Sequence, residues 1–230
     1  LVRIVGAAEA FRASGAADTE AEVLYFLLVE PGSSSSLASS LRMARENVRN
    51  TRDLLPQESW ENVNELYQDA RERLALAARG ENRFECLAEI IGRCQQIDGS
   101  LTGTMSHLSP YHFLVLGQTI ERADMTSRVI DVASAYIQHN ERLVRRYGSS
   151  LWTNVLKSVS GFQMYRQYCQ PQVQGSKVID FLLRDTAFPR AVACCLNSAR
   201  ESARRLPRAD ATTAALDEVG KLLEPVGQDF

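Results

Sequence analysis

The chain has 230 residues, of which 45% are hydrophobic, and this is enough to bury one substantial core. Its 26 basic and 28 acidic residues nearly cancel, which argues against a nucleic-acid partner, and no apolar run approaches the roughly 20 residues of a membrane-spanning helix. Five cysteines without a C-x-x-C pair are typical of a reducing compartment with buried thiols, so we expect a cytoplasmic protein.

Apolar residues recur every three or four positions along nearly the whole chain, and this spacing predicts helices rather than strands. In chain order, the predicted helices cover residues 35–54, a segment after Pro56, and residues 84–105, 109–136, 151–168, 174–183, 188–206 and 212–224. The sequence therefore predicts an all-α bundle of about eight to ten helices, forming a single domain over residues 1–230. The first residue is Leu1 rather than methionine, so we expect that the natural protein has a further N-terminal helix and leave open a larger fusion.

A short pattern occurs twice, as ARENVR at residues 44–49 and as ARESAR at residues 199–204. Shifting the chain on itself by 155 positions aligns both copies without a gap and also aligns Phe26 with Phe181. The repeated polar residues are Arg45, Glu46, Arg49, Arg200, Glu201 and Arg204. The shift predicts an internal duplication of a helix-loop-helix unit. The alternative is chance, because helices rich in Ala, Leu, Arg and Glu resemble one another in composition.

Helical spacing predicts where the repeated charges lie around their helices. Arg45 and Arg200 border the apolar stripe, whereas Glu46 and Glu201 fall on the opposite face. The glutamates are then either ordinary solvent-facing residues or contacts to another layer or partner.

The longest predicted helix carries one narrow charged strip. Gly117, Glu121, Asp124, Arg128 and Asp131 recur every three or four residues, while apolar residues fill most of the remaining circumference. Such a helix is normally central in its bundle, and its strip then reaches water through a gap or lines a polar cleft. The simpler alternative is an ion pair along the helix between Asp124 and Arg128, which are four residues apart.

Arg122 falls on the apolar side of the same helix. An unpaired charge buried there costs several kcal/mol, so the guanidinium is expected either to reach water or to meet a carboxylate. Asp98 lies on the apolar stripe of its own predicted helix and is the candidate partner. Unchanged stability of Asp98→Asn would exclude this pair.

Common catalytic and metal-binding patterns are absent from the sequence. None of His107, His112 and His139 follows a glutamate by three residues, as a di-iron bundle requires, and no two histidines are spaced as zinc ligands. Phosphate-binding and hydrolase motifs are also missing. We therefore expect neither a metal nor a cofactor, and the cysteines are interpreted as structural.

Three stretches carry a resemblance to known proteins: SLRMARENVRNTRDLLPQESWENVNELY, GTMSHLSPYHFLVLGQTIERADMTSRVIDV and MYRQYCQPQVQGSKVIDFLLRDTAFPRAVACCLNSARESARRL. Together they resemble the bacterial Alpha-E domain family, a helical family with a glutamate-arginine motif. The resemblance places the motif at Glu121, Arg122, Ala123 and Asp124, with Arg128 following. It also implies that the natural protein has an earlier helix with another Glu-Arg-Ala motif, which this chain lacks.

The resemblance implies a functional context rather than an activity. The resemblance implies that the domain accompanies a circularly permuted ATP-grasp protein, either fused to it in one chain or as a separate chain. Since ATP-grasp enzymes join a carboxylate to an amine, the leading hypothesis is an accessory domain that binds this ligase or presents its substrate. The strip of Glu121, Asp124 and Arg128 would then be the contact or cleft surface.

Two further hypotheses remain open. In the first, the domain is an independent enzyme of the same peptide- or amide-forming pathway, and Glu121 and Asp124 act as acid and base. In the second, it is a purely structural bundle whose polar strip sets the register of its helices. A deep cleft at the strip favours the enzyme, an apolar-rimmed surface favours the binding domain, and full intramolecular pairing favours the structural bundle. The sequence leaves homo-oligomerisation open.

Overall fold

The computed structural model describes residues 1–138, 141–168 and 172–223, and these residues form only helices and turns. The helices are α1 (Ala8–Ala13), α2 (Glu20–Leu28), α3 (Leu37–Asn50), the 3₁₀ turn η1 (Arg52–Leu54), α4 (Gln57–Ala78), α5 (Arg83–Thr104), α6 (Ser109–Gln138), α7 (Glu141–Ser158), α8 (Phe162–Tyr168), α9 (Gly175–Arg184), α10 (Val192–Ala203) and α11 (Ala209–Lys221). The all-α prediction is confirmed. These described residues contain eleven α-helices, one more than the upper end of the predicted range.

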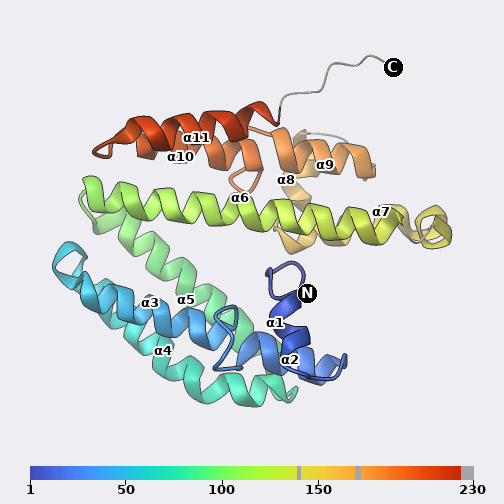
Figure 1. Ribbon diagram of the computed structural model, residues 1–230, viewed down its shortest axis with the longest axis horizontal. Helices are drawn as coiled ribbons and strands as arrows, with labels where there is room; N and C mark the ends of the chain where they lie inside the picture. The colour runs from blue at the N-terminus through green and yellow to red at the C-terminus, as the bar shows by residue number, and fades with distance from the viewer. Residues whose placement is uncertain (139–140, 169–171, 224–230) are drawn as a thin grey trace. The chain divides into compact units, whose positions relative to one another are not determined.

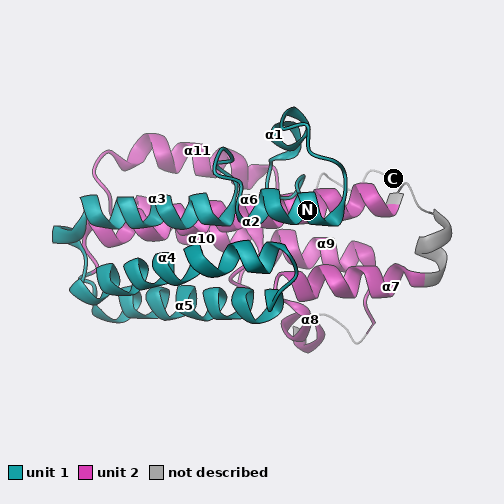
Figure 2. Cartoon of the chain, turned by 90° about the horizontal axis from the view of Figure 1, so that it is seen from below, with its two compact units in different colours: residues 1–106 teal, residues 107–230 magenta. Residues whose placement is uncertain are grey.

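The chain divides into two compact units, residues 1–106 and residues 107–230, which Figure 2 shows in different colours. Unit 1 contains α1 to α5, and unit 2 contains α6 to α11. The division into two compact units does not test whether residues 1–230 form one domain, which stays a prediction.

In unit 1, α4 packs against α2, α3 and α5, as Figure 2 also shows. Its buried side chains, among them Leu66, Ala70 and Leu74, form a core with Leu41 of α3 and Ile90 of α5. A smaller cluster joins α1 to α2, where the rings of Phe11 and Phe26 meet edge to face. The apolar faces of α2, α3 and α5 thus converge on α4.

Two hydroxyl groups set the starts of the first long helices in unit 1. The Thr19 side chain accepts a hydrogen bond from the backbone N–H of Glu22 at the start of α2. The buried Ser36 accepts one from the backbone N–H of Ser39 at the start of α3. Because the first N–H groups of a helix lack partners within it, these two bonds fix where each helix begins.

In unit 2, α6 packs along α10 and also contacts α7 and α9, while α11 packs on α10 (Figure 1). Ala123 of α6 lies in an apolar cluster with Cys195, Leu196 and Ala199 of α10. The buried hydroxyl of Thr126 donates a hydrogen bond to the Arg190 carbonyl, 2.8 Å away, just before α10 begins. One side of α6 is therefore fixed against α10, and this determines which side remains exposed.

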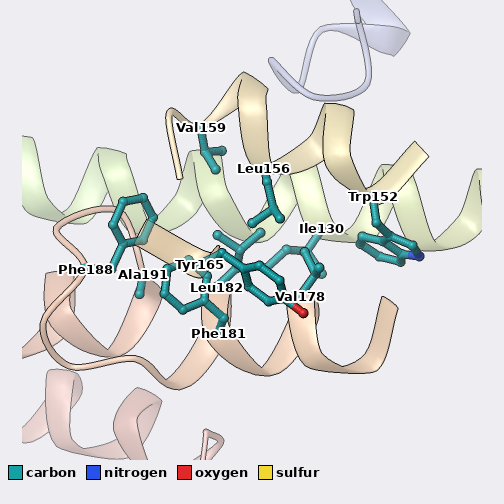
Figure 3. Close-up of a cluster of buried hydrophobic side chains, with 10 residues drawn as sticks. All are labelled: Ile130, Trp152, Leu156, Val159, Tyr165, Val178, Phe181, Leu182, Phe188 and Ala191. Atoms are coloured by element: carbon teal, nitrogen blue, oxygen red, sulfur yellow. The ribbon is translucent and has the colours of Figure 1, made fainter. Parts of the chain in front are cut away.

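The largest buried cluster of unit 2 lies where α7, α8 and α9 meet (Figure 3). Trp152 and Leu156 of α7, together with Val159 just after its end, extend toward side chains of α9. Tyr165 of α8 is fully buried, and its hydroxyl donates to the Gln172 carbonyl at 3.3 Å. The cluster consists of Ile130, Trp152, Leu156, Val159, Tyr165, Val178, Phe181, Leu182, Phe188 and Ala191.

The predicted helix over residues 151–168 is two helices in the structure, because the chain turns at Ser160 and Gly161. Ser160 has a positive φ of 55°. Its N–H binds the Lys157 carbonyl, and the N–H of Gly161 binds the Leu156 carbonyl. These are the two bonds of a Schellman motif, which ends α7 and starts a new direction. The apolar spacing continued across this turn, so periodicity alone did not reveal it.

The shift of 155 residues that aligns the repeated sequences also aligns the first residues of two pairs of helices. Helices α2 and α9 begin at Glu20 and Gly175, and α3 and α10 begin at Leu37 and Val192. The loops correspond as well. Glu30 accepts a hydrogen bond from the backbone N–H of Gly32, and Asp185 accepts one from that of Ala187, both pairs being 155 residues apart. Their common origin by duplication stays a prediction.

Candidate functional site

The predicted strip lies on the side of α6 that faces away from α10. Glu121 and Asp124 are exposed, whereas their neighbours Ala123 and Thr126 are buried. Arg128 donates from Nε to Oδ2 of Asp124 at 2.7 Å, so the pair expected along the helix is present. Such an exposed pair contributes only a few tenths of a kcal/mol.

Large apolar side chains flank this strip on both sides and remain exposed. Phe113 and Ile120 are 59% and 43% exposed on one side of the strip, and Met125 is 39% exposed on the other. Glu121 forms no hydrogen bond or ion pair within the described part of unit 2. We define the α6 face as Phe113, Ile120, Glu121, Asp124, Met125 and Arg128.

Arg122 is half-buried and lies near the thiols of Cys194 and Cys195 on α10. Burial raises the pKa of both thiols, and the nearby positive charge of Arg122 partly opposes that shift. Within the described residues of unit 2, Arg122 forms no ion pair. Asp98 belongs to α5 in unit 1, so its proposed pairing with Arg122 stays a prediction.

Arg45, the first repeated arginine, joins α3 to α4. Its Nε donates to Oδ1 of Asn64 at 2.8 Å, and its guanidinium lies 5.6 Å from the ring centre of Trp60 and 5.2 Å from that of Tyr67. Nη1 also contacts Glu46, which accepts from Arg49 as well. Glu46 is therefore occupied within its own helix rather than free to meet a partner.

Arg200, the second repeated arginine, makes the corresponding connection in unit 2 between α10 and α11. Its Nε donates to Oδ1 of Asp217 at 2.7 Å, and Nη2 donates to the Leu216 carbonyl at 3.0 Å. Nη1 donates to Asn197 within α10 at 2.9 Å. In both units the repeated arginine thus binds, through the same nitrogen, a side chain of the helix that follows.

The remaining repeated residues have no such role within the described residues. Glu201 and Arg204 are exposed and form no side-chain hydrogen bond or ion pair there. The sequence did not identify the acceptors Asn64 and Asp217, because they follow their arginines by 19 and 17 residues, and no fixed spacing marks them. Asn64 meets Arg45 only because α4 packs on α3, and Asp217 meets Arg200 only because α11 packs on α10.

The Arg200 connection can be tested together with Gly220. We expect Arg200→Ala to lower the free energy of unfolding by about 1–2 kcal/mol, because three hydrogen bonds of a charged group are lost at a partly exposed site. A methyl group on Gly220 would lie 2.0 Å from Arg200 Nη2. Gly220→Ala should therefore destabilise the unaltered chain but stabilise Arg200→Ala by up to about 1 kcal/mol through helix propensity.

Urea unfolding of the four combinations measures this coupling as a double-mutant cycle. Arg204→Ala is the matched control, since Arg204 follows the same helix and forms no side-chain bond among the described residues. Equal effects of Gly220→Ala in both backgrounds would show that the Arg200 side chain does not occupy the space beside Gly220.

A network of charges links α4 and α5 in unit 1. Arg93 contacts Glu65 at 3.3 Å, Asp69 at 3.1 Å and Glu89 at 3.9 Å, and Arg73 also pairs with Glu89. The hydrogen bond from Arg73 holds the pKa of Glu89 below its usual value. The network thus adds ion pairs to a contact in which α5 buries only Cys86 and Ile90.

The described residues show no group of histidine, cysteine and acidic side chains that could hold a metal ion. Burial raises the pKa of Cys86, Cys194 and Cys195, which disfavours the reactive thiolate. His139 and Cys169 lie outside the described residues. Within the described helices, none combines the length and the apolar character needed to cross a membrane.

The described residues thus form an all-helical protein, and the candidate site is the exposed α6 face. The sequence matches the model of the Alpha-E family, described as a predicted alpha-helical domain with a conserved ER motif, over residues 1–228. The chain belongs to the Alpha-E family, and the resemblance seen in the sequence is confirmed. Searches of curated proteins and of solved structures gave no match.

Proposed function

We propose that this Alpha-E domain is a non-catalytic partner of a circularly permuted ATP-grasp ligase, and that it binds the ligase or presents a substrate to it through the α6 face. The combination of exposed apolar and charged side chains on this face carries the proposal. Phe113, Ile120 and Met125 border Glu121 and the Asp124–Arg128 pair. Aromatic residues, methionine and arginine are enriched where proteins meet, and exposed apolar patches with polar neighbours mark such surfaces.

The α6 face supports a binding domain better than the two alternatives. An acid and base pair requires buried carboxylates in a cleft, but Glu121 and Asp124 are both exposed, and Asp124 is paired with Arg128. A purely structural strip requires full intramolecular pairing, but Glu121 has no partner within the described part of unit 2. A partner surface accounts for both the unpaired glutamate and the exposed apolar side chains.

The first measurement is ADP release by the ATP-grasp protein over a panel of amino acids, with and without this domain. We expect stimulation only when the domain is present. Glu121→Gln and Arg128→Ala should each reduce this stimulation about tenfold, corresponding to about 1.4 kcal/mol at an interface centre, while the helical circular dichroism and melting temperature stay unchanged.

Glu218→Gln and Arg205→Ala are matched controls, because both residues are exposed on unit 2 and neither belongs to α6. They should leave the stimulation intact. An active ligase that does not respond to the domain would overturn the proposal. Unfolding of the Glu121 or Arg128 variants would instead assign these residues a structural role.

A further inference from the structure

Unit 1 contains a pocket of about 430 Å³ between the end of α2, α3 and α4. Its walls are mainly apolar and include Val29, Ala38, Leu41, Ala70 and Leu74. This volume falls in the range of pockets that hold small molecules, and an apolar wall can bury most of a ligand's surface.

Two arginines on different helices line the same pocket. Arg42 on α3 and Arg71 on α4 are both exposed, and neither forms a side-chain hydrogen bond or ion pair among the described residues of unit 1. No acidic residue lines the pocket. Tyr67 also lines it, and its hydroxyl makes no hydrogen bond within the described part of this unit. The apolar pocket is therefore bordered by two positively charged guanidinium groups and a hydroxyl group whose hydrogen-bond donors are available to a ligand.

Unit 2 has a pocket of about 660 Å³ at the corresponding place, with different chemistry. Shifting by 155 residues replaces Val29 by Arg184 and Arg42 by Asn197, while alanine and leucine walls are kept at Ala193 and Leu196. The arginines of this second pocket are already paired, Arg184 with Asp180 and Arg200 with Asp217. Of these two pockets, only the one in unit 1 combines apolar walls with guanidinium groups that form no ion pair among the described residues of their unit.

We propose that the unit 1 pocket binds a small amphipathic carboxylate, with its apolar body against Leu41 and Leu74 and its carboxylate held by Arg42 and Arg71. Guanidinium groups bind carboxylates through paired, charge-assisted hydrogen bonds, and the Tyr67 hydroxyl adds a further donor. The limited volume favours a free acid over a docked helix. This inference does not depend on the proposed function of the α6 face.

The test is calorimetric titration of the full chain with octanoate, 1-octanol and octylamine, which share one apolar chain and differ in charge. We expect octanoate to bind, octanol to bind at least about tenfold more weakly, and octylamine not to bind. Arg42→Gln combined with Arg71→Gln should weaken octanoate binding about tenfold and leave octanol unaffected. Arg79→Gln, an exposed arginine on the same unit outside the pocket, is the charge control.

A second pair of variants separates the two pockets. Ala38→Leu fills the unit 1 pocket and should abolish octanoate binding, whereas Ala193→Leu at the corresponding position of unit 2 should not. Circular dichroism confirms that each variant is folded. Equal affinity for octanoate and octanol, loss of binding in Ala193→Leu alone, or no binding at millimolar octanoate would each overturn the proposal.

Discussion

Replacing Leu182 with alanine is expected to lower the free energy of unfolding by about 2–5 kcal/mol. Leu182 on α9 is fully buried within the cluster that α7 and α8 complete, where it lies near Leu156 and Tyr165 (Figure 3). Removing its side chain loses the favourable transfer of apolar surface from water and leaves a cavity. The aromatic side chains around it are too rigid to close that cavity.

Urea unfolding followed by circular dichroism and by tryptophan fluorescence measures this loss, because Trp152, one of the two tryptophans, belongs to the same cluster. Leu108→Ala is the matched control, since Leu108 is also in unit 2 but 68% exposed. It should change stability by less than about 0.5 kcal/mol. Equal effects of the two variants would contradict the burial of Leu182.

Gly175→Ala is expected to destabilise the protein by about 1–3 kcal/mol, although alanine normally favours a helix. Gly175 begins α9, and a methyl group there would lie 2.4 Å from Nε1 and 2.9 Å from Cε2 of Trp152. The indole is buried in its cluster and cannot move aside without disturbing neighbouring side chains. Overpacking therefore outweighs the helix propensity of alanine.

For Gly99→Ala we expect the opposite effect, an increase in the free energy of unfolding. Gly99 lies inside α5, and a methyl group there would meet no atom within 4 Å. This variant should stabilise the protein by about 0.5–1 kcal/mol, because alanine loses less backbone entropy than glycine. Thermal and urea unfolding of both variants provide the comparison, and stabilisation by Gly175→Ala would show that the Trp152 indole does not occupy this position.

The helical class and the exposed strip could be predicted because they depend on local spacing. Glu121, Asp124 and Arg128 lie on one side of α6 wherever the helix packs, so the sequence located their common face. Periodicity did not reveal which apolar residues would be buried. Phe84 and Ile91 share a stripe on α5 but are 85% and 58% exposed in the structure.

Features that depend on contacts between helices could not be predicted from one sequence. The bond from Arg45 to Asn64 forms only when α4 packs on α3, and the bond from Arg200 to Asp217 forms only when α11 packs on α10. The unit 1 pocket likewise requires Arg42 and Arg71 to approach from separate helices. The repeat indicated that the two arginines were equivalent, but it did not indicate what they bind.

The charge network between α4 and α5 makes the contact between these two helices sensitive to dissolved salt. Arg93 and its three acidic contacts are partly exposed, so dissolved ions weaken these pairs by screening them and by competing for the charged groups. The cluster around Leu182 has no comparable charges, and sulfate strengthens such apolar burial. The choice of salt, and not only its concentration, therefore shifts the balance between these ion pairs and the apolar clusters in the stability of the chain.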